Sequence, residues 1–406
     1  MPDVFDEISD WLLERSLQDL DLSDTVTGFC ARLMRAGIAV DRLRIGRVVL
    51  HPEIGLLDLT WASDAPGVAW TVVRRDQIDA AAISPTPFGE AMVQDLKKLV
   101  ADLRDPADVA RYPIFETLAA EGITSYALFR HRFGRDQTAL PALPSGAIGT
   151  ILAFATRRFS GFSQTEIAQL ERLSRPLAVC VRVATERYLA TELLETYLGR
   201  NSGRRVLNGQ STRGDWQQIE CALFYSDMRS STALSQSLEA PVYLDLLNSY
   251  FDCTAQAALD HGGEVLKYIG DGLLAIFPCA AGTDARRHAC ASALAAARDA
   301  AQRARSANAD RDRAGAPTFD YAVALHIGQV LYGNIGTRKR LDFTATGPSV
   351  ALVSRLEGLS TELGAPLLAS DAFAAACPGA GHPIGTRTLR GFDAPMALTA
   401  YDLTLD

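Results

Sequence analysis

The sequence predicts an α+β fold with two domains joined by a long helix. In the C-terminal half, the pattern of apolar and polar residues follows the order strand, helix, strand, strand, helix, strand, which is typical of a ferredoxin-like sheet with helices on one face. The N-terminal half alternates helices with short strands, and the stretch 163–198 is helical throughout. We therefore place an N-terminal α/β domain at 1–165, a coupling helix and linker at 166–214, and a C-terminal βαββαβ domain at 215–406.

The composition is that of a globular protein of 406 residues, which gives room for two or three domains. The net charge of −8 and the lack of a long basic run argue against a nucleic-acid partner. No apolar stretch reaches the roughly 20 residues needed to cross a bilayer, and the start is acidic where a secretory signal is basic. The seven cysteines are scattered and form no Cys-x-x-Cys pair, which suits a reducing compartment. We expect a soluble, cytoplasmic protein without a membrane span.

In the N-terminal domain, helical patterns are expected at 4–17 and at 23–36, with Ser23 as the N-cap of the second helix. Stretches with strand character follow at 42–51, 56–61 and 70–73. A helix-rich insertion then contains 92–103 and 113–120, and strands return at 125–130 and 149–155.

This order of elements resembles a GAF-like sensory domain. The resemblance implies that the N-terminal domain receives a small-molecule or protein signal of unknown identity and regulates the rest of the chain. The alternative is a dimerising α+β domain that binds no ligand.

The coupling helix is predicted to begin after Ser163, which is spaced with Glu166 as a capping box. Pro176 lies within this helix and is expected to bend or interrupt it. Apolar residues recur along one side at three-four-three spacing, at Leu170, Leu173, Leu177 and Cys180. This seam could pack against the same helix of a second subunit, or on its own domain. The linker that follows contains several glycines and could act as a hinge.

In the C-terminal domain, strands are expected at 220–226, 264–269, 273–277 and 319–327. One helix is expected at 231–260, with a break at Pro241, and another at 283–304. The polar run 310–317 contains Gly and Pro and is expected to form a loop.

Two acidic residues lie at strand ends of this domain. Asp271 precedes Gly272 between two apolar runs, which is a strong signal for a hairpin turn with a carboxylate at its tip. Asp227 follows the first strand, just ahead of a predicted helix whose first N–H groups can bind an anion. Two carboxylates brought together suit a pair of Mg²⁺ ions, which clamp the attacking and leaving oxygens in phosphoryl chemistry.

Four separated segments, at 225–232, 264–271, 325–336 and 342–355, resemble the catalytic domain of class III nucleotidyl cyclases. The resemblance extends from about residue 219 to the C-terminus, which is nearly half of the chain. It implies a lyase, an adenylate cyclase that converts ATP to 3′,5′-cyclic AMP and pyrophosphate.

The resemblance also implies roles for individual residues. Asp227, Asp271 and the backbone carbonyl of Met228 would bind two Mg²⁺ or Mn²⁺ ions per active site. One ion would activate the ribose 3′-hydroxyl, and the other would hold the triphosphate and the departing pyrophosphate. Ser231 and Thr232, at the start of the following helix, would contact the phosphates.

Base choice and phosphate binding are assigned to five further residues. Lys267 corresponds to the family position that is lysine in adenylyl cyclases and glutamate in guanylyl cyclases, and Thr344 would accept a hydrogen bond from the adenine amino group. Arg355 would stabilise negative charge on the α-phosphate in the transition state. Arg338 and Arg390 are candidate contacts to the outer phosphates.

In this family the metal ligands and the base contacts come from different subunits, so the resemblance implies a catalytic homodimer. One residue departs from the family pattern. Ala351 stands where the family usually has an asparagine that orients the ribose, and its side chain cannot form a hydrogen bond. Ser349 or Ser354 could replace that contact. The alternative is a catalytically impaired, nucleotide-binding regulatory protein.

Overall fold

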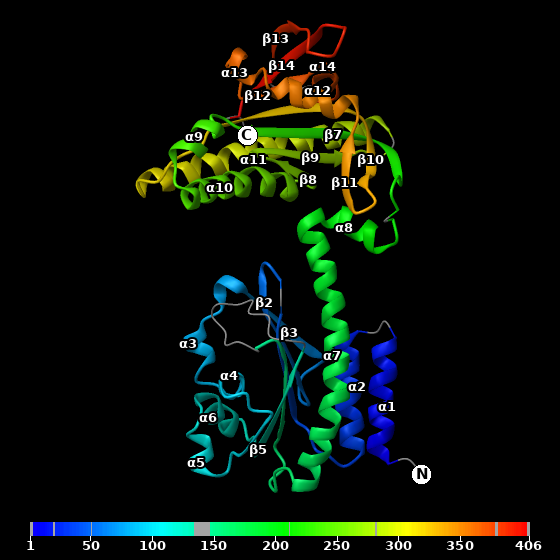
Figure 1. Ribbon diagram of the computed structural model, residues 1–406, viewed down its shortest axis with the longest axis vertical. Helices are drawn as coiled ribbons and strands as arrows, with labels where there is room; N and C mark the ends of the chain where they lie inside the picture. Colours follow the sequence, from blue (N-terminus) through cyan, green and yellow to red (C-terminus); the bar gives the residue numbers. More distant parts are fainter. Residues whose placement is uncertain are drawn as a thin grey trace. The chain divides into compact units, whose positions relative to one another are not determined.

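The computed structural model describes residues 3–18, 21–49, 51–133, 147–210, 212–280, 282–377 and 381–403 (Figure 1). The chain divides into two compact units, Met1–Leu193 and Leu194–Asp406. In the part that the structure describes, no helix combines the length and the apolar character needed to cross a membrane.

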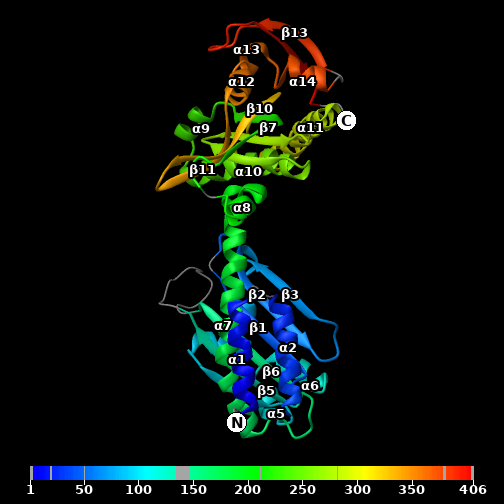
Figure 2. The same ribbon diagram turned by 90° about the vertical axis from the view of Figure 1, so that its right-hand side faces the viewer.

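The N-terminal unit is built on a six-stranded antiparallel sheet with the order β3-β2-β1-β6-β5-β4. The strands are β1 (Arg42–Val48), β2 (Ile54–Ala62), β3 (Val68–Arg74), β4 (Lys98–Asp102), β5 (Ser125–Arg132) and β6 (Gly149–Thr156). Figures 1 and 2 show α1 (Val4–Leu17), α2 (Leu22–Arg35) and α7 (Gln164–Leu198) side by side on one face. The other face carries η1 (Arg75–Gln77), α3 (Ala80–Ile83), α4 (Pro87–Val93), α5 (Pro106–Val109) and α6 (Pro113–Ala120). A separate apolar core fills each side of this sheet.

The prediction of a helix at 92–103 is wrong. Helix α4 ends at Val93, Asp95 takes a positive φ of 52°, and Lys98–Asp102 forms the edge strand β4, paired with β5. Leu99 and Ala101 are buried while their neighbours are more exposed, which is the period of a strand. The short apolar pattern fits both helix and strand, and pairing with β5 decides between them.

The N-cap of α2 also differs from the prediction. It is Asp21, whose carboxylate accepts hydrogen bonds from the N–H groups of Ser23 and Asp24 at 2.6 and 3.3 Å. Ser23 itself lies within the first turn of the helix. Asp and Ser are both favoured N-caps, so composition alone did not separate them.

Helix α7 begins with the predicted capping box, in which the Ser163 N–H donates to Glu166 at 2.8 Å and the Glu166 N–H donates to Ser163 Oγ at 3.3 Å. The helix continues through Pro176 without interruption. Its apolar seam is buried in the core of its own unit, together with Phe29 and Phe154. The alternative that this seam packs on its own domain is therefore confirmed, and the prediction of a seam against a second subunit is wrong.

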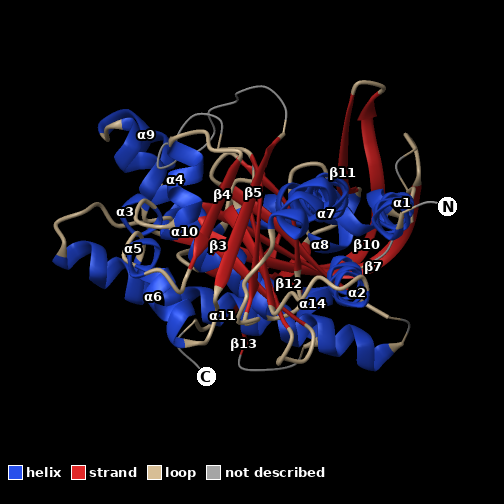
Figure 3. Cartoon of the chain, turned by 90° about the horizontal axis from the view of Figure 1, so that it is seen from below, coloured by secondary structure: helices blue, strands red, loops and turns tan. Residues whose placement is uncertain are grey.

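The C-terminal unit contains a larger sheet with the order β13-β14-β12-β10-β7-β9-β8, and β11 pairs with β10 outside this path. The strands are β7 (Trp216–Met228), β8 (Glu264–Ile269), β9 (Gly272–Pro278), β10 (Tyr321–Thr337), β11 (Arg340–Thr346), β12 (Leu367–Ser370), β13 (Gly381–Arg387) and β14 (Met396–Tyr401). The central order β10-β7-β9-β8 is that of the predicted ferredoxin-like sheet, with the fourth and third strands flanking the first. Figure 3 shows β10 and β11 as a long two-stranded arm.

Helices cover both faces of this sheet, so the prediction of helices on one face is wrong. Side chains of β7 alternate between two cores, with Ala222 and Phe224 facing α10 and α11 and with Leu223 and Tyr225 facing α12. A strand buried on both faces reads as a continuous apolar run, which does not reveal how many faces are covered. The helices of this unit are α8 (Arg200–Leu207), α9 (Ser231–Ser237), α10 (Ala240–Asp260), α11 (Thr283–Arg313), α12 (Pro348–Glu357), α13 (Ser360–Leu363) and α14 (Asp371–Ala376).

Three further boundaries are informative. The predicted break near Pro241 is confirmed, because α9 ends at Ser237 and Pro241 lies in the first turn of α10. Helix α11 extends to Arg313, so the first half of the predicted loop at 310–317 is helical. Arg311 holds this helix end in place, because its side chain donates hydrogen bonds to Asp245, Ser249 and the Pro317 carbonyl. The linker after α7 contains a helix of its own, α8.

Candidate active site

Strand pairing brings Asp227 and Asp271 together. Asp227 is paired with Gly272 across β7 and β9, and Asp271 immediately precedes that glycine. The hairpin turn consists of Gly270 and Asp271, because Ile269 pairs with Gly272. Gly270 takes a φ of 65°, which the first turn position of such a hairpin requires. The predicted turn with a carboxylate at its tip is confirmed, with the turn one residue earlier than Asp271-Gly272.

The electrostatics of this pair favour a cation. Burial, a hydrogen bond to Asp271 and the charges of Asp271 and Glu357 raise the pKa of Asp227 to about 7. Burial and the charge of Asp271 also raise the pKa of Glu357, against the opposing effects of a hydrogen bond from Ser360 and of the charge of Arg229. Asp227 forms no ion pair in the part of the chain that the structure describes, and its buried Oδ1 has no hydrogen-bond partner.

These observations fit a divalent cation at Asp227 and Asp271, because hard cations prefer carboxylate oxygens and would satisfy the orphaned Oδ1. The side chain of Met228 is buried in the core, so only its backbone is available to such an ion. Among the described residues no group of three or more His, Cys, Asp or Glu side chains has the geometry of a metal site, so the protein ligands would be two carboxylates and a carbonyl.

The raised pKa of Asp227 makes a prediction for the metal-free protein. A carboxyl whose pKa is higher in the folded state than its ordinary value of 3.8 stabilises the fold fully below about pH 4, and this contribution is lost as pH rises through about 7. We expect the Tm of the metal-free protein to fall between about pH 5 and about pH 8, and to fall less for Asp227→Asn. Thermal melts in EDTA across this range measure the effect, and equal slopes for both proteins would contradict it.

The residues assigned to base choice meet at the contact of β8 with β11. Lys267 Nζ lies 3.5 Å from Asp342 Oδ2. Thr344 is two residues from Asp342 on the same strand and therefore faces the same side. Its side chain is buried, and its hydroxyl donates a long hydrogen bond to the Ala345 carbonyl at 3.4 Å. The structure therefore places Lys267 beside β11, the strand that carries Thr344, and adds Asp342, which the sequence analysis did not single out.

Arg355 and Ala351 lie one turn apart on α12, and both are exposed. Arg355 forms no ion pair within the described residues, so it does not contact Asp227 or Asp271 of its own chain. The two serines considered as substitutes for the missing asparagine have other neighbours. Ser354 hydrogen-bonds the side chain of Tyr225, and Ser349 packs against the backbone of Gly328.

The structure does not bring the remaining arginines to the acids. Arg338 lies in the turn between β10 and β11. Strand β10 runs from Tyr321, which pairs with Met228 beside the acids, to Gly333, which pairs with Trp216 at the other end of β7, and onward to that turn. Arg390 is exposed between β13 and β14, at the opposite edge of the sheet from β8.

Ser231 and Thr232 open helix α9, and Asp227 lies near the end of the preceding strand β7. The turn that joins strand and helix places Ser230 at a φ of 58°, an uncommon conformation for a residue with a side chain. The start of α9 thus lies close to Asp227 along the chain, as the sequence predicted.

Sequence reasoning missed the role of Glu264, which begins β8 three residues before Lys267. Its buried carboxylate accepts hydrogen bonds from the Ser202 N–H at 3.1 Å and the Ser202 hydroxyl at 2.6 Å, and from the Tyr332 hydroxyl at 2.9 Å. Asn201 adds a bond at 3.3 Å. Helix α8 is thereby fixed to the strand that carries Lys267. The sequence signal that could have identified Glu264 is a charged residue at the first position of a largely apolar strand.

Comparison with known proteins bears on the same region. Residues 216–364 match the family described as the adenylate and guanylate cyclase catalytic domain. The chain is 31% identical over 182 residues to adenylate cyclase 1 of Rhizobium meliloti (strain 1021), which covers 44% of this chain and 27% of that protein. It is 32% identical over 149 residues to an adenylate cyclase of Anabaena cylindrica, which covers 37% of this chain and 29% of that protein. The chain thus spans less than a third of the length of these two relatives.

The solved structure of the adenylyl cyclase CyaB from P. aeruginosa has a TM-score of 0.40 and 26% identity, and the match covers 46% of this chain and 96% of that one.

Proposed function

We propose, from the cyclase catalytic domain that residues 216–364 match, that this chain is a cytoplasmic adenylate cyclase that converts ATP to 3′,5′-cyclic AMP and pyrophosphate. The observation that carries the proposal is the pairing of Asp227 with the Asp271 turn, which leaves a buried carboxylate oxygen without a partner. Both named curated relatives are adenylate cyclases, which supports ATP as the substrate.

Asp227, Asp271 and the Met228 carbonyl would hold two Mg²⁺ or Mn²⁺ ions. Such ions, when bound, lower the pKa of a hydroxyl nucleophile and neutralise charge on the leaving phosphates. The N–H groups at the start of α9, with Ser231 and Thr232, would receive the triphosphate, since the first turn of a helix has N–H groups without intrahelical partners.

Lys267 would donate a hydrogen bond to N1 of adenine, and Thr344 would accept one from the adenine amino group. Asp342 supports this assignment, because its carboxylate lies 3.5 Å from Lys267 Nζ and limits where that side chain can point. Guanine presents an N–H donor where adenine has N1, so a lysine at this place disfavours GTP.

Arg355 would stabilise the negative charge that develops on the α-phosphate, which is the kind of charge that preorganised donors act on most strongly. Its exposed position, without an ion pair among the described residues, supports its use at the site of a second subunit. The proposed active form is therefore a homodimer in which each site takes its acids from one chain and Arg355 from the other. Arg338 and Arg390 would reach the outer phosphates in the same way.

The N-terminal unit would act as a GAF-like regulatory domain. Its position before the catalytic unit, and the continuous helix α7 that leads out of it, support this assignment. Comparing turnover by the full chain with that of a protein beginning at Leu194, where the second unit starts, tests whether residues 1–193 change the rate.

The direct test is to incubate the purified chain with ATP or GTP in the presence of Mg²⁺ or Mn²⁺, and to quantify cyclic nucleotide and pyrophosphate. We expect cyclic AMP to be the main product. Greater turnover of GTP than of ATP would contradict the assignment of Lys267 and Thr344. Tight ATP binding without any cyclic product would favour a nucleotide-binding regulator, the second candidate that Ala351 motivates.

Replacing Ala351 by asparagine is expected to raise turnover. An orienting hydrogen bond to the ribose can contribute on the order of 10²-fold in rate, and the exposed position of Ala351, one turn before Arg355, leaves space for the longer side chain. The measurement is kcat for ATP in the variant and in the unmodified protein. Ala351→Gln, which carries the same amide on a longer side chain, is the control, and an equal gain in both variants would contradict a positioned contact.

A further inference from the structure

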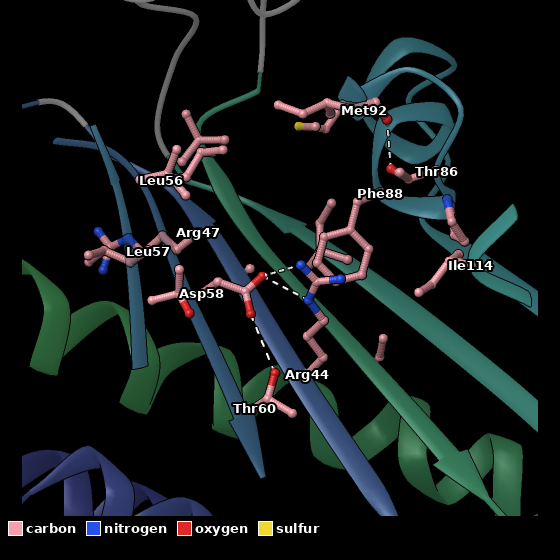
Figure 4. A pocket seen from close by; sticks show the side chains of 18 of the residues that line it. Arg44, Arg47, Leu56, Leu57, Asp58, Thr60, Thr86, Phe88, Met92 and Ile114 are labelled. Carbon is pink, nitrogen blue, oxygen red and sulfur yellow. Dashed lines mark hydrogen bonds and ion pairs between the residues drawn. The ribbon is translucent and has the colours of Figure 1, made fainter. Parts of the chain in front are cut away.

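The N-terminal sheet carries a cavity that the proposed catalysis does not use. It lies on the face opposite α7, between β1, β2 and β6 on one side and α3, α4 and α6 on the other, and its volume is about 600 Å³ (Figure 4). Binding sites for small molecules typically enclose about 300–1,000 Å³. We call it the sheet cavity.

Small side chains on the central strands create this space. Gly46 on β1 and Gly149, Ala153 and Ala155 on β6 form the floor. A Cβ atom on Gly46 would lie 2.5 Å from the ring of Phe88, so only glycine allows this ring to lie against the floor. On β2, the side chains of Leu56, Asp58 and Thr60 are only half-buried, although strands flank β2 on both sides, because they face the cavity.

The walls of the sheet cavity are largely apolar, with one polar edge. The apolar part comes from Val48, Leu56, Phe88, Met92, Ile114 and Leu118. At the polar edge, Arg44 Nε and Nη2 lie 2.8 and 2.7 Å from Asp58 Oδ2, and the guanidinium lies over the Phe88 ring at 5.2 Å (Figure 4). Thr60 donates a long hydrogen bond to Asp58 at 3.5 Å.

Each charged residue that lines the cavity already has a partner. Arg42 pairs with Glu121 at 3.1 Å, and Asp79 accepts a hydrogen bond from the Ala81 N–H at 2.8 Å. The side chain of Arg47 points to the other face of the sheet, where it donates to the carbonyls of Val181 and Arg182. A phosphate or another strongly charged ligand would therefore enter an apolar space without a free counter-ion, which is costly.

We propose that the sheet cavity binds a neutral, planar heterocycle that carries an N–H donor next to a carbonyl acceptor, as in a lactam. Its N–H donates to the Asp58 carboxylate, and its carbonyl accepts from Nη1 of Arg44, which has no hydrogen-bond partner among the described residues. The ring packs against Phe88 and the apolar wall. The Arg44–Asp58 ion pair presents a donor and an acceptor side by side. The adjacent N–H and carbonyl of a lactam match both groups, whereas an acid or an amine alone matches only one.

Ligand binding in the sheet cavity would change the contacts that the sheet makes with α7. Arg47 on β1 and Leu57 on β2 are among the residues that line the cavity, and their side chains make contacts on the opposite face of the sheet. There Arg47 donates to carbonyls of α7 and Leu57 packs with Leu189. Binding itself does not depend on the proposed catalytic function, so it can be tested without an activity measurement.

The test uses two neutral lactams, quinolin-2(1H)-one and the larger phenanthridin-6(5H)-one, each beside the parent heterocycle that lacks the N–H and carbonyl pair. Isothermal titration of the full chain gives the affinities. We expect saturable binding of at least one lactam, about tenfold or more tighter than its parent, because two hydrogen bonds are added. No saturable binding of either lactam, or equal affinity for lactam and parent, would overturn the proposal.

Three variants locate the binding. Asp58→Ala should abolish the preference for the lactam while leaving weak binding of both compounds, and Ala153→Leu should abolish binding by filling the floor. Glu53→Ala removes an exposed ion pair with Arg74 on the same sheet, outside the cavity, and should change nothing. Circular dichroism and Tm establish that each variant is folded. Unchanged lactam preference in Asp58→Ala would place the ligand elsewhere and refute the assignment.

Discussion

Replacing Asp271 by alanine is expected to lower the turnover of ATP by at least about 10³-fold, since loss of one group that stabilises developing charge costs about 10²–10³ and here an ion site is lost as well. The same change should raise the Tm of the metal-free protein. Asp271 is a cause of the raised pKa of Asp227 and of Glu357, so its removal relieves repulsion among carboxylates. Turnover and thermal melts are measured on the same preparation.

The opposite signs of these effects separate a lost metal ligand from a damaged fold. A misfolded variant loses both activity and Tm, whereas a variant that lacks only the ion site loses activity and gains Tm. Asp284→Ala is the matched control, because this aspartate is fully exposed at the start of α11 and far along the chain from the hairpin. Turnover above about a tenth of the wild-type value in Asp271→Ala would contradict the role of Asp271 in holding an ion.

The features of the fold and of the candidate site that were predictable from the sequence depend on residues close together in the chain. The Asp271 turn, the capping box of Ser163 with Glu166, and the position of Asp227 at the end of β7 each follow from signals within a few residues. The edge strand Lys98–Asp102 was not predictable in this way, because its pattern fits two periods and its partner β5 is more than 20 residues away.

The contacts that the sequence did not reveal join distant segments. Ser202 meets Glu264, Lys267 meets Asp342, and Ser354 meets Tyr225, and in each case no pattern near one residue in the sequence indicates its partner. The sheet cavity depends on small residues of β1 and β6 facing one another across about a hundred positions of sequence. Such features are products of packing, and a single sequence records them only as ordinary glycines, alanines and serines.

Mixing two inactive variants is expected to restore activity if the site is shared between subunits. Asp271→Ala lacks an acid, and Arg355→Ala lacks the arginine that would act on the partner's substrate, so each alone has no complete site. In a mixed dimer, one site takes its acids from the Arg355→Ala chain and its arginine from the Asp271→Ala chain, and it is intact. Random assortment should give about a quarter of the wild-type turnover, since about half of the dimers are mixed and one of their two sites works.

The two variants should be co-expressed with different affinity tags and purified through both, so that only mixed dimers are assayed, with turnover expected at about half of the wild-type value. The reason is geometric: Arg355 is exposed and pairs with no acid among the described residues of its own chain, and Asp227 likewise has no cation. If Arg355 served the acids of its own chain instead, every site in a mixed dimer would carry one lesion and no activity would return. Asp271→Ala paired with Asp227→Ala is the control. It should stay inactive whether Arg355 serves its own chain or the partner, because both acids of a site come from one chain and each chain lacks one of them.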